Sequence, residues 1–363
     1  MNRRHFLRST SVAFAGFTMW KAELFCAEQP PTDAWRTFEV TTQVEVLKPV
    51  GGTKVWLPAA LIQDTVFQRT SGNRFTADGG EARLVEGSKP QALGIVAATF
   101  PPGVRPVLTL SSQVALKNYS VNLYKPGNGQ PLTSSQLAYY LQPTQHVPTD
   151  GIVKSTATDI TKGAKTDIEK AQAIYDWIVD NTFRDPKVRG CGLGDIRFML
   201  ESGNLGGKCA DLNALYVGLA RSAGLPARDV YGIRVAKSNL GYKSLGASSE
   251  KVTKAQHCRA EVYLTQFGWV PVDPADVRKV VLEEPPGNRP SNDEMVASAR
   301  KRLFGSWEMN WMAYNFAQDV ELPGSNGTKV NFLMYPQAQT AEGTLDSLDP
   351  DNFKYEITAR ELS

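Results

Sequence analysis

The chain has 363 residues, with 40 basic and 37 acidic side chains and a formal net charge of +3. This length allows a full hydrophobic core and two or three domains. Because the charges are nearly balanced, the composition gives no support for nucleic-acid binding or for attachment to an anionic membrane surface.

The first 30 residues predict an export signal. Arg3 and Arg4 are followed by Phe6 and Leu7, and an apolar run covers residues 11–20. A charged start before a short apolar stretch is typical of a secretory signal, and adjacent arginines resemble the twin-arginine type. About ten apolar residues are too few to cross ~30 Å of hydrocarbon, and no other segment is longer. We expect a periplasmic or otherwise exported protein with no stable membrane span in its mature part.

Residues 31–125 predict a β-rich N-terminal domain. Polar and apolar residues alternate at 37–46, 53–58 and 107–116, and turns rich in Gly or Pro separate these segments. Such alternation is typical of half-buried strands, so we expect a β-sandwich-like domain. Residues 126–150 follow as a connector.

Residues 151–285 form the predicted catalytic core, because the apolar period changes from two to about 3.6 residues near its start. Thr166 and Glu169 match a capping box, which predicts a helix that ends near Phe183. A second helix is predicted from Cys209 to Ala223, where a Gly-Leu-Pro sequence ends it.

Three strands are predicted after the second helix, at residues 229–235, 257–265 and 269–273. The last two are joined by a tight turn and should pair as a hairpin. The Ser-, Lys- and Gly-rich segment 241–254 is predicted to be a mobile loop that could gate a nearby site. Residues 286–363 form a C-terminal extension with a helix near 294–304 and terminal strands near 329–335 and 353–358.

The four cysteines predict one free thiol. Cys26 is expected to leave with the signal if cleavage follows Ala27; residues 24–26 are also a weak match to a lipoprotein signal. Three remain, Cys191, Cys209 and Cys258, which is an odd number in a compartment expected to be oxidising. We expect a disulfide between Cys191 and Cys258 that leaves Cys209 free; the alternative is three unpaired thiols.

Cys209 is the candidate nucleophile. It follows two glycines and Lys208 at the predicted start of a helix, where unpaired N–H groups and the helix dipole stabilise a thiolate. The alternative is that Cys209 is only a small buried apolar residue, as most free cysteines are.

His257 is the leading candidate for the base. The chain has three histidines: His5 lies in the signal and His146 lies in a proline-bounded stretch. His257 begins a predicted strand, and strand alternation places Cys258 on the opposite face, away from the reacting atoms. Taken alone, His257 could also be a polar residue at a sheet edge.

Asp273 is the candidate partner of His257. A catalytic histidine needs an acceptor that fixes its tautomer, and Asp273 lies near the end of the paired strand. Asp276 is the rival acceptor, and an Asx-type turn with Pro274 is the structural alternative for Asp273. A thiol at a helix start followed by His and Asp on adjacent strands is more specific than any of the three residues alone.

Four segments carry a family resemblance: residues 206–211 (GGKCAD), 219–228 (LARSAGLPAR), 256–262 (QHCRAEV) and 268–274 (GWVPVDP). In this order they resemble the transglutaminase-like (papain-like) superfamily of Cys-His-Asp proteins, and the flanking regions are similar to its exported bacterial members. The resemblance implies an α+β fold, with a nucleophile helix packed on an antiparallel sheet and an N-terminal β-sandwich-like domain.

The resemblance also implies the roles of the site residues. Cys209 would form a thioester with an acyl group, His257 would protonate the leaving amine and activate the acceptor, and Asp273 would orient His257. The oxyanion hole would combine the backbone N–H of Cys209 with a side-chain donor, for which Trp177 and Asn204 are guesses.

These observations predict a thiol enzyme that acts on a peptide or protein substrate, either by amide hydrolysis or by acyl transfer. The alternative is a non-catalytic module that keeps the fold to bind a peptide or a cell-wall component. A redox protein is disfavoured because no CxxC pair is present. No cofactor and no metal are expected, since paired metal-ligand motifs are absent.

Overall fold

The computed structural model describes residues 34–363 except 128, 326 and 328. The predicted signal at residues 1–30 lies outside the described residues. The chain from Asp33 to Ser363 forms one compact unit, and the described part contains no helix that is long and apolar enough to span a membrane.

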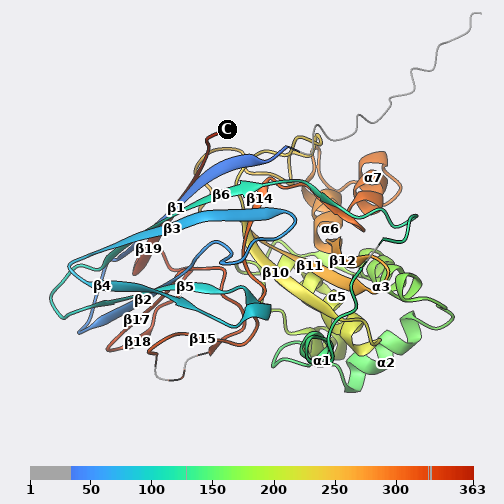
Figure 1. Ribbon diagram of the computed structural model, residues 1–363, viewed down its shortest axis with the longest axis horizontal. Helices are drawn as coiled ribbons and strands as arrows, with labels where there is room; N and C mark the ends of the chain where they lie inside the picture. The colour runs from blue at the N-terminus through green and yellow to red at the C-terminus, as the bar shows by residue number, and fades with distance from the viewer. Residues whose placement is uncertain (1–33, 128, 326, 328) are drawn as a thin grey trace, which may run out of the picture. The chain divides into compact units, whose positions relative to one another are not determined.

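The strand-rich N-terminal region forms a β-sandwich, as predicted, together with strands from the end of the chain (Figure 1). One antiparallel sheet has the order β19-β1-β6-β3 and contains β1 (Arg36–Val46), β3 (Gln68–Asp78), β6 (Val107–Leu116) and β19 (Phe353–Glu361). The other has the order β18-β17-β2-β5-β4 and contains β2 (Thr53–Pro58), β4 (Glu81–Glu86), β5 (Gly94–Phe100), β17 (Gln337–Thr340) and β18 (Gly343–Thr344). A 3-10 turn at Lys89–Gln91 precedes β5.

Alternate side chains of the two sheets meet in one apolar layer. Val44 and Leu108 come from the first sheet, Leu57 and Val96 come from the second, and all four are buried. This alternation is the pattern from which the sandwich was predicted.

The last strand of the chain completes the first sheet. β19 pairs antiparallel with β1 over its whole length, from Phe353 opposite Val46 to Glu361 opposite Phe38. The terminal strand predicted near 353–358 is therefore confirmed, whereas the strand predicted at 329–335 is only the two-residue β16. Residues 286–363, which were expected to form a C-terminal extension, supply strands to both sheets of the sandwich. The domain boundaries drawn from the sequence stay a prediction.

The second half contains a four-stranded antiparallel sheet of order β12-β11-β10-β14. Its strands are β10 (Ala227–Arg234), β11 (Gln256–Leu264), β12 (Gly268–Val272) and β14 (Trp311–Asn315). The predicted hairpin is confirmed, because β11 and β12 pair from Leu264 opposite Gly268 to Ala260 opposite Val272.

Seven helices lie in the described part of this half: α1 (Ser134–Leu141), α2 (Gly151–Ile160), α3 (Asp167–Asn181), α4 (Ile196–Ser202), α5 (Cys209–Ser222), α6 (Pro274–Glu283) and α7 (Glu294–Arg302). Of these, α1, α3 and α5 contact the sheet, α5 most extensively. Short strand pairs complete the fold: β7 (Tyr119–Ser120) with β13 (Ser306–Trp307), β8 (Phe183–Arg184) with β9 (Gly206–Gly207), and β15 (Val320–Glu321) with β16 (Lys329–Val330).

Local sequence signals explain where the two predicted helices begin. At α3 the Thr166 hydroxyl accepts a hydrogen bond from Glu169 N at 3.3 Å, and the Glu169 carboxylate accepts one from Thr166 N at 3.2 Å. This is the predicted capping box. Helix α5 begins at Cys209 as predicted, but all its residues are buried, so it is a central helix rather than an amphipathic one.

Helix α5 lies against β10 and β11 and is surrounded by α2, α3, α4 and α6 (Figure 1). Gly218 allows this close packing, since a Cβ there would lie 2.1 Å from Ile196. Four helices were not predicted: α1 lies inside the expected connector, α2 and α4 lie on either side of the predicted helix α3, and α6 follows directly on β12. The central position of α5 fixes its first residue over one end of the sheet.

Candidate active site

Cys209 is the first residue of α5 and is 4% exposed. The first turn of a helix leaves N–H groups without intrahelical acceptors, so a negative charge on this thiol is stabilised by them and by the helix dipole. The preceding Gly207 leaves no room for a side chain, because a Cβ at this position would lie 2.6 Å from the Cβ of Asp211.

Asp211 holds the glycine-rich loop against the start of α5. Its Oδ1 accepts hydrogen bonds from the N–H groups of Leu193 and Gly194 at 3.0 and 2.9 Å, and its Oδ2 accepts one from Lys208 N at 2.9 Å. Gly192, at φ +95°, passes so close that a Cβ would lie 1.8 Å from Asp211 Oδ2. The buried carboxylate therefore fixes the backbone on both sides of Cys209.

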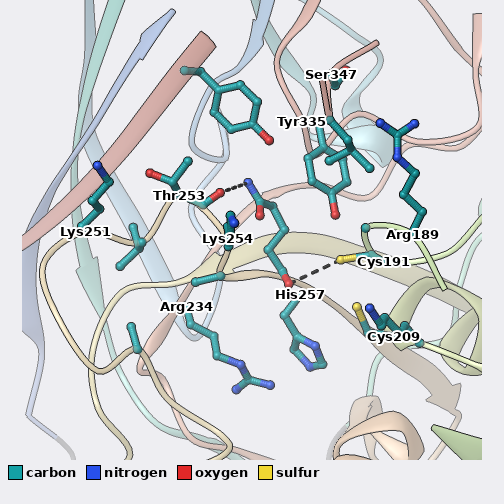
Figure 2. Close-up of a pocket in the computed structure, with 18 of the residues that line it drawn as sticks. Arg189, Cys191, Cys209, Arg234, Lys251, Thr253, Lys254, His257, Tyr335 and Ser347 are labelled. Atoms are coloured by element: carbon teal, nitrogen blue, oxygen red, sulfur yellow. Dashed lines mark hydrogen bonds between the residues drawn. The ribbon is translucent and has the colours of Figure 1, made fainter. Parts of the chain in front are cut away.

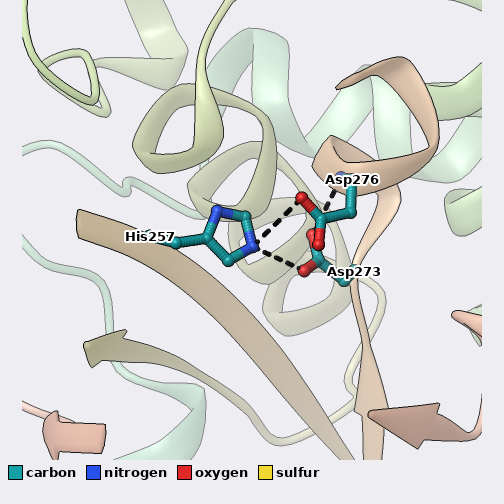
Figure 3. A group of neighbouring side chains, drawn as sticks. All are labelled: His257, Asp273 and Asp276. Atoms are coloured by element: carbon teal, nitrogen blue, oxygen red, sulfur yellow. Dashed lines mark hydrogen bonds and ion pairs between the residues drawn. The ribbon is translucent and has the colours of Figure 1, made fainter. Parts of the chain in front are cut away.

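His257 lies at the start of β11 with its imidazole turned toward two carboxylates (Figure 3). Its Nε2 is 2.7 Å from Asp273 Oδ2 and 3.4 Å from Asp276 Oδ1. Asp273 is thus the nearer acceptor, although the rival Asp276 also faces the ring. Because Nε2 is used by these carboxylates, Nδ1 remains for the thiol.

Asp273 is both the acceptor that faces His257 and a residue that binds the backbone of the following turn, the two interpretations that the sequence left open. Its Oδ2 faces His257, while its Oδ1 accepts a hydrogen bond from Asp276 N at 3.0 Å and caps α6. Asn213 of α5 also donates to Asp273 Oδ1, at 3.3 Å, and to the carbonyl oxygen of Cys258, at 2.9 Å. The nucleophile helix and the strand that carries His257 are therefore joined through one buried amide.

Two buried arginines neutralise the two carboxylates. Arg234 donates to both oxygens of Asp276, at 2.6 and 2.8 Å. The Nε of Arg259 is 3.7 Å from Asp273 Oδ2. The oxygen and nitrogen atoms of His257, Asp273 and Asp276 lie within 4.8 Å of one another and could in principle hold a cation. Because Arg234 already occupies Asp276, we interpret the group as a hydrogen-bonded network.

The neighbours of His257 favour its protonated form. Burial and Arg234 would lower the pKa of His257, but Asp276 and Asp273 more than offset this, and the pKa is raised. Burial would raise the pKa of Asp276, yet Arg234 and His257 hold it well below its usual range. The imidazolium is therefore stabilised by at least one ionised carboxylate.

Cys191, Cys209 and Cys258 are all free and buried, so the expected disulfide between Cys191 and Cys258 is wrong for this structure. The Cys191 thiol donates to Gln256 O at 3.4 Å, and the Cys258 sulfur lies 3.9 Å from that of Met334. Cys258 was also expected to stay away from the reacting atoms, but its thiol lies close enough to Cys209 to lower the pKa of that thiol. Helix α5 begins over the end of β11, where residues of both strand faces reach it.

These thiols act on the candidate nucleophile. The neighbouring Cys191 and Cys258 thiols hold the pKa of the Cys209 thiol well below its usual range; burial opposes this, and His257 adds to it. The Cys209 thiol in turn raises the pKa of Cys191, and burial raises the pKa of Cys258. The two neighbours therefore favour their protonated forms, while Cys209 favours the thiolate.

Cys209 and His257 lie on the wall of a cleft of about 780 Å³. Figure 2 shows the sulfurs of Cys191 and Cys209 close to the imidazole of His257, with the hydroxyl of Tyr335 directed toward the same region. The 241–254 segment lines the opposite wall. It is anchored there, because Glu284 accepts hydrogen bonds from Lys243 N and Ser244 N.

Comparison with known proteins identifies the fold and the family. The family model of the transglutaminase-like superfamily matches residues 154–274. An uncharacterized protein of Haemophilus influenzae is 35% identical over 350 residues, which cover 91% of this chain and 93% of the relative. The chain belongs to the transglutaminase-like superfamily.

Two solved structures are similar to this chain. The crystal structure of a proposed cysteine protease of Cytophaga hutchinsonii superposes with a TM-score of 0.57 at 13% identity, covering 91% of this chain and 92% of that one. The periplasmic domain of TgpA from Pseudomonas aeruginosa is 13% identical, with a TM-score of 0.35, and covers 70% of this chain and 91% of that domain. The first of these shares its fold with this chain over nearly the whole length of both.

Several residues that surround this transglutaminase-like site were not found from the sequence. Asn213 lies one helical turn after Cys209, and its helical spacing was the only signal for it. Trp311 donates its indole N–H to the carbonyl oxygen of His257 at 2.9 Å. Tyr335 comes from the C-terminal extension and lines the cleft. No local pattern links the last two to Cys209, because they reach the site only through tertiary structure.

The two residues guessed as oxyanion donors do not line the cleft. Trp177 lies in α3, and its carbonyl oxygen accepts a hydrogen bond from Asn181. Asn204 is exposed, and its side chain accepts a hydrogen bond from Gly206 N. Neither guess is supported. The backbone N–H of Cys209, at the start of α5, remains the candidate donor to the oxyanion.

Proposed function

We propose that the chain is an exported thiol enzyme that cleaves an amide bond through a thioester on Cys209. One observation carries the proposal: the imidazole of His257, hydrogen-bonded to Asp273 at 2.7 Å, lies beside a thiol whose pKa is well below its usual range. A lowered thiol pKa next to a base that is oriented by a third group is the arrangement expected of an activated nucleophile.

The first half-reaction forms the thioester. The thiolate of Cys209 attacks the carbonyl carbon of the amide, and the carbonyl electron pair moves to the oxygen. The N–H groups at the start of α5 stabilise the resulting oxyanion. When the oxyanion collapses, the C–N bond breaks, and the proton on His257 Nδ1 passes to the leaving amine.

The second half-reaction releases the acyl group. His257, now neutral, takes a proton from the acceptor, which attacks the thioester carbon, and Cys209 leaves as the thiolate. The acceptor is water in hydrolysis and an amine in acyl transfer. Asp273 keeps the imidazole oriented in both halves and stabilises its charged form.

The non-catalytic alternative is disfavoured by the same contacts. A module that only binds a peptide or a cell-wall component does not need a thiol of lowered pKa. Nor does it need a buried histidine between two carboxylates, because buried charges are costly unless they serve a purpose. The membership of the chain in the transglutaminase-like superfamily supports an enzyme in general and leaves hydrolysis and acyl transfer open.

The proposal is tested by trapping the thioester. The purified protein is mixed with a pool of fluorescence-quenched peptides at pH 7, quenched in acid and measured by intact mass. We expect an acyl adduct that maps to Cys209 and is absent from Cys209→Ala. Cleavage that survives in Cys209→Ala would refute the proposal. Adding a dansylated primary amine separates the two reactions, since only acyl transfer incorporates it into product.

Export rests on residues 1–30 alone. If the twin-arginine signal operates, replacing Arg3 and Arg4 by lysine should retain the full-length precursor inside the cell, as seen by fractionation and immunoblotting. Unchanged export of this variant would contradict the twin-arginine route.

A further inference from the structure

The cleft beside Cys209 is lined by charges of one sign. Eight lysine and arginine side chains contribute to its wall, and no aspartate or glutamate does. The chain as a whole carries a net charge of only +3. The positive charge is therefore concentrated at the site and does not follow from the composition.

Five of these cations have carboxylate partners outside the cleft wall. They are Arg184, Arg189, Arg234, Lys251 and Lys279. Four carboxylates serve the five, because Arg184 and Lys279 share Glu283. Eight cations against four carboxylates leave an excess of four positive charges around the cleft.

The remaining three are Lys208, Lys254 and Lys354, which have no ion-pair partner among the described residues. They come from three different parts of the chain: the start of α5, the loop before β11, and β19. Lys254 and Lys354 are exposed to solvent. Three lysines that converge on one cleft from distant segments and remain unpaired there are available to pair with a ligand.

We propose that the substrate of this site is an acidic peptide, whose Asp or Glu side chains pair with the unpaired lysines while its amide lies at Cys209. The inference rests on the proposed function, since Cys209 requires a ligand that carries an amide. A cleft of about 780 Å³ lies within the usual range of ligand sites, ~300–1,000 Å³. A cleft lined by one sign of charge attracts ligands of the opposite sign and excludes those of the same sign.

Binding is measured apart from turnover, in the full-length Cys209→Ala protein. Three fluorescein-labelled dodecapeptides share one central Gly-Gln-Gly-Ala sequence and carry glutamates, serines or lysines in the flanks. Anisotropy at 50 mM salt should give a dissociation constant at least about tenfold lower for the glutamate peptide than for the serine peptide, with the weakest binding for the lysine peptide. The preference should shrink at 500 mM salt, because salt screens such pairs.

Two lysines are then removed together. In the Cys209→Ala background, Lys254→Gln with Lys354→Gln should weaken binding of the glutamate peptide by about three- to tenfold, as expected for two exposed ion pairs. Binding of the serine peptide should not change. Lys162→Gln serves as the matched control, because Lys162 is an exposed lysine outside the cleft wall.

Equal binding of the glutamate and serine peptides would overturn the inference, as would an unchanged affinity in the double lysine variant. A single-stranded oligonucleotide that binds as tightly as the glutamate peptide would overturn it too, since the site would then select a polyanion and not a peptide. If the glutamate preference holds but no peptide is cleaved by the wild-type protein, the charge selection stands and the proposed enzymatic function fails.

Discussion

Replacing Asp273 by asparagine tests whether the carboxylate activates Cys209 through His257. The hydrogen bond between His257 Nε2 and Asp273 Oδ2 is 2.7 Å long and fully buried. A hydrogen bond to a charged group contributes about 1.5–3 kcal/mol, which corresponds to a factor of roughly 10–150 in rate. Asp276, at 3.4 Å from the same nitrogen, remains in Asp273→Asn and should keep the effect near the lower limit.

The assay is alkylation by iodoacetamide as a function of pH, with each cysteine followed by peptide mass mapping. In the wild type, the pKa of Cys209 is lowered and that of His257 is raised, so Cys209 should react well below the pH at which an ordinary thiol ionises. In Asp273→Asn the imidazolium loses a stabilising charge. The pKa of His257 should fall, that of Cys209 should rise, and the rate at pH 6 should drop about tenfold or more.

Asp229→Asn is the matched control. Asp229 is a buried carboxylate on β10 that faces Gln318 at 2.6 Å and does not contact His257. This variant should keep the wild-type alkylation profile. If Asp273→Asn keeps that profile too, while its circular dichroism and melting temperature show a folded protein, the role assigned to Asp273 is wrong.

Three further predictions concern the surroundings of the site. Gly192→Ala places a Cβ 1.8 Å from an Asp211 oxygen, so thermal unfolding should show a loss of about 2–3 kcal/mol; Gly163→Ala, at nearly the same φ but with nothing within 4 Å, should lose clearly less. Cys191→Ala removes the thiol that contributes most to the lowered pKa of Cys209 and should slow alkylation at pH 6 by about two- to tenfold; an unchanged rate would contradict this. Burial raises the pKa of Asp229 to about 7, so between about pH 4 and 7 the folded state binds the proton that the unfolded state releases, and stability falls as pH rises. Asp229→Asn should remove this loss, on the order of 3–4 kcal/mol at pH 8, as measured by urea unfolding at pH 4 and pH 8.

The sequence was sufficient for elements whose signals are local. The capping box at Thr166 and Glu169, the helix from Cys209 and the hairpin of β11 and β12 depend on neighbouring residues, and all three are present. The helix α1 was missed because it lies in a segment with little apolar periodicity, and only Tyr140 of it is buried. A short, mostly exposed helix leaves a weak pattern.

The site itself was predictable only in part. Cys209, His257 and Asp273 were candidates because histidine is scarce and because strand pairing was expected to bring the last two together, and the structure places His257 and Asp273 in contact. The arginines were not found, since Arg234 and Asp276 lie 42 residues apart and meet through the packing of α6 on the sheet. The sequence pattern also placed Cys258 away from Cys209, because alternation describes the faces of a strand but not what lies over its end.

The buried charges around His257 are balanced. Burial and Asp276 raise the pKa of Asp273, while His257 and Arg259 oppose this rise. With both carboxylates ionised, Asp273 and Asp276 are balanced by Arg234 and Arg259, and all four are almost fully buried. Burial lowers the pKa of Arg259 to about 10, so it is still charged at neutral pH, held over the ring of Trp311. Because isolated buried charges are costly, a set with no net charge is the arrangement in which four ionised groups can remain in the interior.

This balance bears on the state of the reacting pair. If the surrounding groups carried a net positive charge, they would disfavour the imidazolium of His257; a net negative charge would disfavour the thiolate of Cys209. Moving one proton from Cys209 to His257 leaves the net charge of the buried region unchanged. Because the two carboxylates are compensated by the two guanidinium groups, the charge of the surroundings favours neither the neutral pair nor the ion pair. The local contacts then decide, and they favour transfer: the carboxylates lie at His257 Nε2, and the helix start and two thiols lie at Cys209. The arginines therefore contribute to thiol activation without touching the reacting atoms, by allowing two carboxylates to stay ionised beside one histidine.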